Sequence, residues 1–244
     1  MFKKILVGFL LLFLVVSLGF VVWGSTPASP MPEAMVALTS DSQVEVSSGN
    51  WLVFKPTDGN YQSGYIFYPG GRVDYRAYAP YAHAIAGEGY LVVIPRMPLN
   101  LAVFGINTAD KVITAFPEVK GWVIGGHSLG GSMAANYVSK NSSEIDGLVL
   151  LASYPASSDD LSNFPGQVVS ISATLDGLAT PEKIEASQEL LPSSTRWVVI
   201  DGGNHAYFGW YGDQKGDNEA KITREEEQSI TIQSSLDLLN QISR

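Results

Sequence analysis

The sequence predicts an α/β protein, with a mostly parallel sheet covered by helices on both faces. Short apolar runs, too short for helices, alternate along the chain with longer segments of helical period. This alternation is typical of parallel strands joined by crossover helices. The strand runs are almost continuously apolar, as expected for strands buried on both sides. An apolar segment at the N-terminus precedes this pattern.

The N-terminal segment is long enough for a transmembrane helix. It runs unbroken from Ile5 to Trp23, about 19 residues, close to the ~20 that a helix needs to cross hydrocarbon. Lys3 and Lys4 precede it, and the next basic residue is Lys55. The positive-inside bias therefore predicts a single-pass protein of the cell membrane, with a cytoplasmic N-terminus and an extracytoplasmic domain. The alternative is a secreted protein released by signal cleavage, although no clear A-x-A site follows the segment.

The predicted organisation has three parts. We expect an N-terminal membrane anchor (or uncleaved signal) over 1–24, a spacer over 25–35 and a single globular domain over 36–244. Ser25 to Pro32 is rich in Ser and Pro, which predicts an extended spacer with no core of its own.

Composition excludes several kinds of chemistry. The chain has no cysteine and hence no disulfide, cysteine nucleophile or lipid-modified cysteine. The formal net charge is −9, and because two lysines precede the apolar segment while every acidic residue follows it, the remainder carries −11. Such a surface repels nucleic acid. The polar stretch 212–219 lacks the spacing of a calcium loop. We expect no cofactor, no metal and no nucleic-acid partner.

The α/β pattern opens with a predicted hairpin of Gln43 to Val46 and Trp51 to Phe54. Six predicted buried strands follow: Gly64 to Tyr68, Tyr90 to Ile94, Gly121 to Gly125, Gly147 to Ala152, Val168 to Ser172 and Trp197 to Ile200.

Segments of helical period between these strands predict the helices. They are Tyr75 to Gly87, Thr108 to Phe116, Leu129 to Lys140 and one that opens at Thr180-Pro181-Glu182. The last helix opens at Thr223-Arg-Glu-Glu226, a capping box. Only Ser153 to Gln167 separates two of the strands, which is too short for a large helical lid. We expect a minimal lid and an open or lightly covered catalytic edge.

A nucleophile elbow is predicted at Gly126-His127-Ser128-Leu129-Gly130, which matches G-x-S-x-G. The match alone is weak, but a buried strand precedes it and a helical segment with small residues follows it. So sharp a turn crowds the backbone and needs glycine at 126 and 130. It would present Ser128 at the carboxyl edge of the sheet, where the dipole of the following helix favours developing negative charge.

A serine hydroxyl needs a base, and histidine is suited to that role near neutral pH. The chain has three histidines. His83 lies in a predicted helix and His127 adjoins the serine, whereas His205 follows the last strand at the same sheet edge as the elbow. Elimination and placement therefore favour His205 as the base.

An acid should orient the imidazole from the end of a neighbouring strand. Asp176 has that position, and the order serine, aspartate, histidine is that of the α/β-hydrolase arrangement. Asp201 is a rival but is more typical of a turn former. Asp159 and Asp160, after the preceding strand, are weaker alternatives.

An oxyanion hole would take one N–H from Leu129 and one from the loop Tyr68-Pro-Gly-Gly-Arg-Val-Asp. The second donor is Gly71 or Arg72, and the sequence does not choose between them.

These motifs resemble the α/β-hydrolases, specifically the dienelactone hydrolase-like or α/β-hydrolase family 5 group. The resemblance extends from about Trp51 to the last helix. It is carried by the Gly-Gly loop, the elbow, and the segments Leu150-Leu-Ala-Ser-Tyr-Pro-Ala, Leu175-Asp-Gly-Leu-Ala-Thr-Pro and Gly202-Gly-Asn-His-Ala-Tyr-Phe-Gly. It implies the same triad of Ser128, Asp176 and His205. Dienelactone hydrolase uses a cysteine where this chain has Ser128, so lactone specificity does not transfer.

We therefore expect a carboxylesterase-like serine hydrolase that acts through an acyl-enzyme on a small-molecule or lipid-like ester. Alternatives are an acyltransferase or perhydrolase on the same triad, or an inactive membrane-tethered binding protein. Loop aromatics at the catalytic edge are candidates for a substrate pocket or for core packing: Tyr154, Phe164, Tyr207, Phe208, Trp210 and Tyr211.

Overall fold

The computed structural model describes residues 2–61 and 63–242. Its centre is an eight-stranded sheet with the strand order β1-β2-β4-β3-β5-β6-β7-β8. The strands are β1 (Val44–Ser48), β2 (Trp51–Pro56), β3 (Ser63–Tyr68), β4 (Leu91–Pro95), β5 (Gly121–His127), β6 (Gly147–Leu151), β7 (Gln167–Ala173) and β8 (Arg196–Ile200). The pairs β1–β2 and β2–β4 are antiparallel and all others are parallel. The prediction of a mostly parallel sheet that opens with a hairpin is confirmed.

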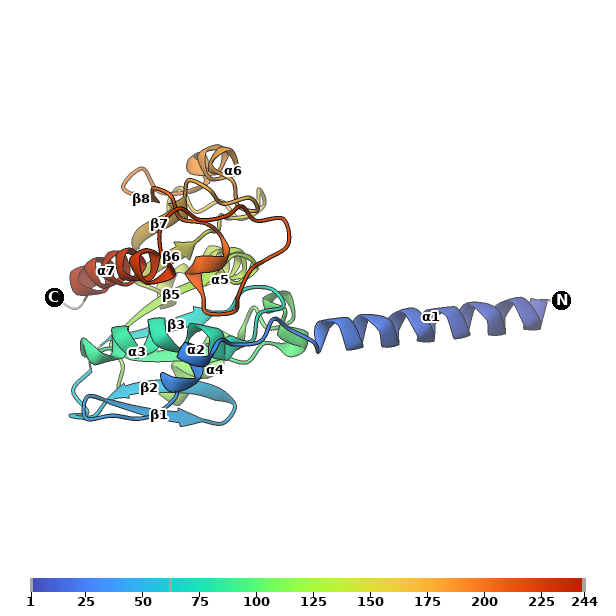
Figure 1. Cartoon of the computed structure of the whole chain (residues 1–244), viewed down its shortest axis with the longest axis horizontal. Coiled ribbons are helices and arrows are strands. Elements are labelled where there is room, and N and C mark those ends of the chain that lie inside the picture. The colour runs from blue at the N-terminus through green and yellow to red at the C-terminus, as the bar shows by residue number, and fades with distance from the viewer. Residues whose placement is uncertain (1, 62, 243–244) are drawn as a thin grey trace.

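Helices cover both faces of the sheet (Figure 1). One face packs against α3 (Ala79–Gly87) and α7 (Arg224–Ile242), and the other against α4 (Thr108–Ala115) and α5 (Leu129–Lys140). The smaller helices are α2 (Pro32–Val36), α6 (Pro181–Ala186) and the 3-10 turns η1 (Tyr75–Tyr78), η2 (Pro98–Asn100), η3 (Ala102–Phe104), η4 (Ser142–Glu144), η5 (Gln188–Leu190) and η6 (Ala206–Phe208). No helix lies between β6 and β7 in the described residues, in accord with the predicted minimal lid.

Local sequence explains where two of these helices begin. The helix predicted over 75–87 is divided into η1 and α3, because Pro80 lacks an N–H and fits only the first turn of a new helix. At the start of α7 the capping box forms as predicted. Thr223 N–H donates to Glu226 Oε2 at 2.7 Å, and Glu226 N–H donates to Thr223 Oγ1 at 3.2 Å.

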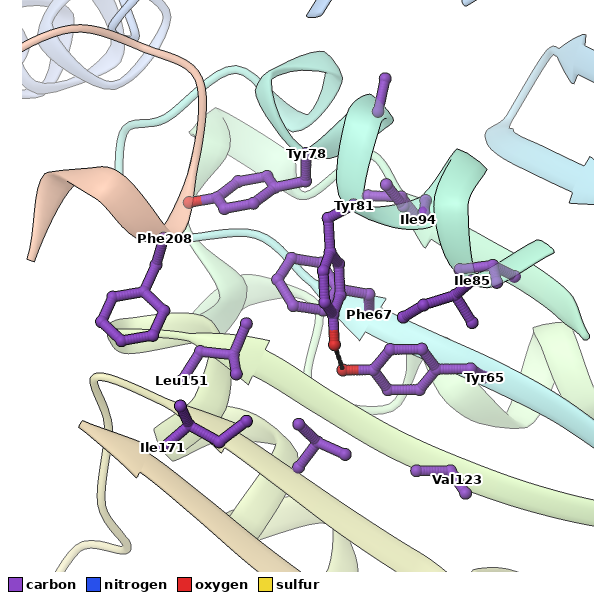
Figure 2. Close-up of a cluster of buried hydrophobic side chains, with 14 of the residues drawn as sticks. Tyr65, Phe67, Tyr78, Tyr81, Ile85, Ile94, Val123, Leu151, Ile171 and Phe208 are labelled. Carbon is purple, nitrogen blue, oxygen red and sulfur yellow. Dashed lines mark hydrogen bonds between the residues drawn. The ribbon is translucent and has the colours of Figure 1, made fainter. Parts of the chain in front are cut away.

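Aromatic side chains fill the core between the sheet and α3 (Figure 2). The rings of Tyr65 and Phe67 on β3 meet Tyr81 of α3 at centroid distances of 6.1 and 5.3 Å. Tyr78 extends this cluster toward Phe208 of η6 (Figure 2). The rigid core therefore reaches the carboxyl ends of the strands, where the predicted site residues lie.

The N-terminal helix α1 (Phe2–Gly24) projects from one end of the domain, and α7 ends on the opposite side (Figure 1). Within it, Lys4–Gly24 is long and apolar enough to cross a membrane. The segment 25–35 differs from the extended spacer that was expected. Ala28 bridges to Val73, residues from Pro32 form α2, and Ala34 is fully buried. This segment packs because Ala28 pairs with backbone and Ala34 is small enough to enter the core.

Candidate active site

Ser128 stands at the turn between β5 and α5. Its φ of 52° and ψ of −124° lie outside the conformations that a serine prefers. Such strain persists only where the surroundings hold it, and here the Ser128 N–H donates to Leu151 O at 2.9 Å while Ser153 Oγ donates to Ser128 O at 2.7 Å. The half-buried Ser128 thus stands at the carboxyl edge of the sheet, as the elbow motif predicts.

The two glycines of the elbow are required by close backbone approach. A β-carbon built on Gly126 would lie 2.5 Å from Tyr68 O, and one built on Gly130 would overlap the same oxygen. Neither contact is possible for a real side chain. The end of β3 therefore fixes glycine on both sides of the serine, and this close packing sets the sharpness of the turn.

His205 and Asp176 form a buried pair beside the elbow. His205 Nδ1 lies 2.8 Å from Asp176 Oδ2, and the two residues are 1% and 2% exposed. The other carboxylate oxygen, Oδ1, accepts the N–H groups of Leu178 and Ala179, both at 2.7 Å. These donors fix the carboxylate, which in turn fixes the imidazole. His205 Nε2 has no hydrogen-bond partner among the described residues, so it is the ring atom left to exchange a proton.

The rival acids lie in other surroundings. Asp201 is exposed and accepts from Thr174 Oγ1 at 3.2 Å, as expected of a turn residue. Asp159 is buried and accepts from Asn136 Nδ2 at 2.8 Å, and the exposed Asp160 accepts the N–H of Ser162 at 2.9 Å. Of the four candidates, Asp176 is the one bonded to His205.

His127 connects the elbow to His205. Their ring centroids are 4.5 Å apart, so His205 lies against the residue that precedes Ser128. His127 Nδ1 shares a 2.8 Å hydrogen bond with Tyr78 Oη. Burial, with a smaller effect from neighbouring His205, holds the pKa of His127 well below its usual range. A neutral His127 places no positive charge beside the His205 ring.

The predicted oxyanion loop lies against the elbow, since a β-carbon built on Gly71 would be 3.0 Å from Leu129 Cδ2. Two N–H groups of this loop are engaged: Gly70 donates to Tyr78 Oη at 3.0 Å, and Arg72 donates to Asn100 O at 2.7 Å. Arg72 is therefore unsuited as the donor. Gly71 N–H forms no hydrogen bond within the described part of the chain, and Leu129 N–H, at the first position of α5, has no intrahelical acceptor.

Asp217 is a residue that the sequence analysis missed. Its Oδ1 accepts the Gly177 N–H at 3.0 Å and its Oδ2 accepts the Ala206 N–H at 2.9 Å. One carboxylate thereby joins the loop that carries Asp176 to the loop that carries His205. The sequence showed only an acidic stretch over 212–219, and no local pattern indicates contact with two distant loops.

The loop aromatics mostly pack inside the protein. Phe208 stacks on His127 at 5.9 Å between ring centroids. Phe164, Trp210 and Tyr211 are also buried, whereas Tyr154 and Tyr207 are half-buried. Of the two roles that the sequence left open, burial favours core packing for Phe164, Phe208 and Trp210, whereas the buried Tyr211 also lines a groove.

The sheet order, the helices on both faces and the strand–serine–helix turn define an α/β-hydrolase fold. The chain belongs to the alpha/beta hydrolase family, whose model matches residues 64–229, more than half of the sequence. The family resemblance predicted from the motifs is confirmed. No curated protein sequence matches the chain.

Solved structures share the fold at low sequence identity. Esterase Est2 of the planctomycete Thermogutta terrifontis, bound to butyrate, has a TM-score of 0.62 and 14% identity, and the match covers 82% of this chain and 94% of that one. The same esterase phosphonylated by sarin has a TM-score of 0.62 and 15% identity, with 84% and 96% covered. A protein assigned as a dienelactone hydrolase from Klebsiella pneumoniae has a TM-score of 0.58 and 16% identity, with 78% and 92% covered.

Proposed function

We propose that the chain is a serine hydrolase of carboxylic esters, with Ser128 as nucleophile, His205 as general base and Asp176 as the acid that orients it. The observation that carries the proposal is the buried 2.8 Å contact between His205 Nδ1 and Asp176 Oδ2 beside the strained elbow. It leaves Nε2 as the proton acceptor, as a serine triad requires. Leu129 and Gly71 would supply the oxyanion N–H groups.

The reaction would proceed in two halves. His205 Nε2 takes the proton of Ser128 Oγ as this oxygen attacks the ester carbonyl, and the N–H groups of Leu129 and Gly71 bind the oxyanion. The carbon–oxygen bond to the alcohol breaks, and His205 gives the proton to the departing oxygen, which leaves an acyl-Ser128. Water, deprotonated by His205, then attacks the acyl carbon. The bond from this carbon to Ser128 Oγ breaks, and His205 returns the proton to Ser128 Oγ. The products are a carboxylic acid and an alcohol.

Three features support the hydrolysis of carboxylic esters. The family is that of α/β hydrolases, and its solved neighbours include an esterase that binds butyrate and is phosphonylated by sarin. An organophosphorus agent of this kind reacts with an activated serine. The nucleophile here is Ser128, in place of the cysteine of dienelactone hydrolase, so a general esterase is the better supported assignment.

We also propose that 1–24 is a retained anchor, with the catalytic domain over 36–244 outside the cytoplasm. Helix α1 has the length and apolar composition of a single span, and its lysines precede the apolar run. Immunoblots of membrane and medium fractions test this. A full-length product in the membrane is expected, whereas a shorter, freely released product contradicts the anchor.

Ester hydrolysis by the purified full-length chain in detergent tests the enzymatic proposal. We expect cleavage across a panel of p-nitrophenyl esters, and loss of cleavage with Ser128→Ala or His205→Ala. Ser132→Ala is a matched control, since Ser132 lies in α5 and donates to Tyr154 O at 2.6 Å. Equal activity of the Ser128→Ala variant would refute the proposal. Added methanol distinguishes acyl transfer, because a methyl ester would then replace the free acid as product.

A further inference from the structure

The end of α1 is fixed to the catalytic edge by side-chain contacts. Arg72 Nε donates to Trp23 O at 3.0 Å, and its terminal nitrogen donates to Thr26 O at 2.8 Å. The same guanidinium stacks over the Trp23 ring, 4.4 Å from its centroid. From the next loop, Asn100 Nδ2 donates to Gly24 O at 2.8 Å. The helix is therefore held in one orientation by the loops that flank the elbow.

Backbone bonds continue this attachment beyond the helix. Ala28 N–H donates to Arg72 O at 2.7 Å, and Asp74 N–H donates to Ala28 O at 3.0 Å. The loop that receives these bonds also contains Gly71, the proposed oxyanion donor. Arg72, which contacts the end of α1, therefore directly follows Gly71 in this loop.

An apolar projection lies beside the last turns of α1. Val103 and Phe104 of η3 are 40% and 53% exposed, and the Phe104 ring meets that of Phe20 at 6.2 Å. Phe20 lies one turn, about 6 Å, before the helix end at Gly24. If α1 spans the bilayer, Trp23 and Arg72 lie at the level of the head groups and Phe20 lies in the apolar region below them. Phe104 contacts Phe20 and therefore lies at the same depth.

A groove lies between the segment after α1 and the proposed oxyanion loop. It has a volume of about 500 Å³. One wall comes from the segment after α1, through Thr26, Pro27 and Ala28, one from Gly71 and Arg72 of the oxyanion loop, and one from the segment that contains Tyr211, Asp213 and Lys215. A substrate in this groove would be close to the end of α1 and would reach the loop that lies against the elbow.

We propose that these contacts hold the catalytic edge against the outer surface of the membrane, with Val103 and Phe104 inserted beside α1, and that the substrate is an acyl ester of a membrane-resident amphiphile. This inference rests on the proposed function, since it assumes the retained anchor and the ester hydrolysis at Ser128. Val103 and Phe104 would contact the lipid that surrounds α1. The ester would enter along the groove, and water would release its acid and alcohol as described above.

Depth measurements test the orientation without reference to activity. The chain has no cysteine, so Phe104→Cys carries a nitroxide at one defined position in the full-length protein, reconstituted in phosphatidylcholine vesicles. Val199→Cys is the control, because Val199 is 62% exposed on β8, an edge strand of the sheet. We expect the label at 104 to collide with oxygen and to be shielded from a water-soluble nickel chelate, and the label at 199 to behave oppositely. Equal nickel access at the two positions would overturn the orientation.

Kinetics with two esters test the substrate class. Wild type is compared with the double variant Val103→Ser and Phe104→Ser, and with Val199→Ser, on methylumbelliferyl oleate in phosphatidylcholine vesicles and on methylumbelliferyl acetate in water. We expect the double variant to lose about tenfold in the oleate-to-acetate rate ratio, because it loses apolar contact with lipid, and Val199→Ser to keep the wild-type ratio. An unchanged ratio in the double variant overturns the inference.

The wild-type rates separate failure of this inference from failure of the proposed function. Cleavage of the acetate without cleavage of the vesicle-bound oleate overturns the lipid-like substrate and leaves the proposed function intact. Cleavage of neither ester refutes the proposed function and with it the substrate class, and the orientation is then decided by the nitroxide alone.

Discussion

The aromatic core beneath α3 and the catalytic edge of the same sheet differ in whether their buried polar atoms are hydrogen-bonded. In the core, Tyr65 Oη bonds to Tyr81 Oη at 3.1 Å, Tyr81 donates to Ser235 Oγ at 2.7 Å, and Ser235 donates to Thr231 O at 2.8 Å (Figure 2 draws the first of these). At the edge, His205 Nε2 is buried and has no hydrogen-bond partner among residues 2–61 and 63–242.

Backbone conformation differs in the same way between the two regions. Ser128, Arg72 and Ala152 have positive φ values of 52°, 57° and 44°, and all three follow strands at the catalytic edge. Unpaired polar atoms and strained backbone reduce stability. The comparison indicates that the core supplies the stability that the edge gives up for chemistry.

The largest expected effect is the loss of ester hydrolysis on substitution of Ser128 at the catalytic edge. Ser128→Ala should lower ester hydrolysis by about 10⁴-fold or more, since the triad acts as a unit. Ser128→Gly should be equally inactive but more stable by about 1 kcal/mol, because glycine tolerates a positive φ. Ester assays and thermal unfolding of both variants measure this. A glycine variant no more stable than the alanine variant would contradict the strain.

A smaller loss of activity is expected from Asp217→Ala, which frees the N–H groups of Gly177 and Ala206. Because these bonds position the loops of Asp176 and His205, kcat should fall about 10- to 100-fold. Glu219→Ala, at an exposed residue of the same stretch, is the control and should retain activity. If Asp217→Ala changed KM but not kcat, the result would argue against a role of Asp217 in positioning these loops.

Glu227 is a second buried polar group that should lower stability, and its effect should depend on pH. Burial raises the pKa of this carboxyl from 4.5 to about 8. Below pH 4.5 it is protonated in both states. Between there and pH 8 the unfolded chain ionises while the folded chain keeps the proton, so the free energy of unfolding falls as pH rises. Glu227→Gln should remove this fall and be more stable at pH 7 by roughly 2 kcal/mol. Denaturant unfolding across this range measures it, and parallel curves for both proteins would contradict it.

The smallest effect is expected from Tyr81→Phe, which interrupts the hydrogen-bond chain of the core. Loss of the hydroxyl should cost about 1–2 kcal/mol of stability and leave ester hydrolysis unchanged. Tyr90→Phe is the control, since the Tyr90 hydroxyl bonds to Asn240 Oδ1 at 2.8 Å in a less buried place and should cost less. Activity loss in the Tyr81 variant would mean that the core and the edge are not independent.

Local sequence patterns predicted the elements and much of the edge, because these depend on neighbours in the chain. The strand runs, the Thr223–Glu226 box and the elbow glycines were found in this way, and His205 and Asp176 were paired through the rule that parallel strands end at one edge. The insertion of β3 between β4 and β5 could not be predicted, since apolar runs of similar composition do not encode their order.

Contacts between distant segments were likewise beyond local patterns. Asp217 bonds to residues 40 and 11 positions away, and the Arg72 side chain reaches Thr26, 46 positions earlier. The sequence also could not show whether Gly71 or Arg72 is the second oxyanion donor, because this depends on the bond from Arg72 N–H to Asn100 O. In each case the fold, and not proximity along the chain, brings the polar group to its partner.

The central claim is that His205, held by Asp176, activates Ser128. Its most direct test is labelling of the full-length chain with a fluorophosphonate, followed by peptide mass spectrometry. We predict a single adduct on the peptide that contains Ser128, formed rapidly in the wild type, much more slowly in Asp176→Asn and not at all in His205→Ala. A folded wild-type protein that takes up no label, or label that forms equally fast without His205, would contradict the claim.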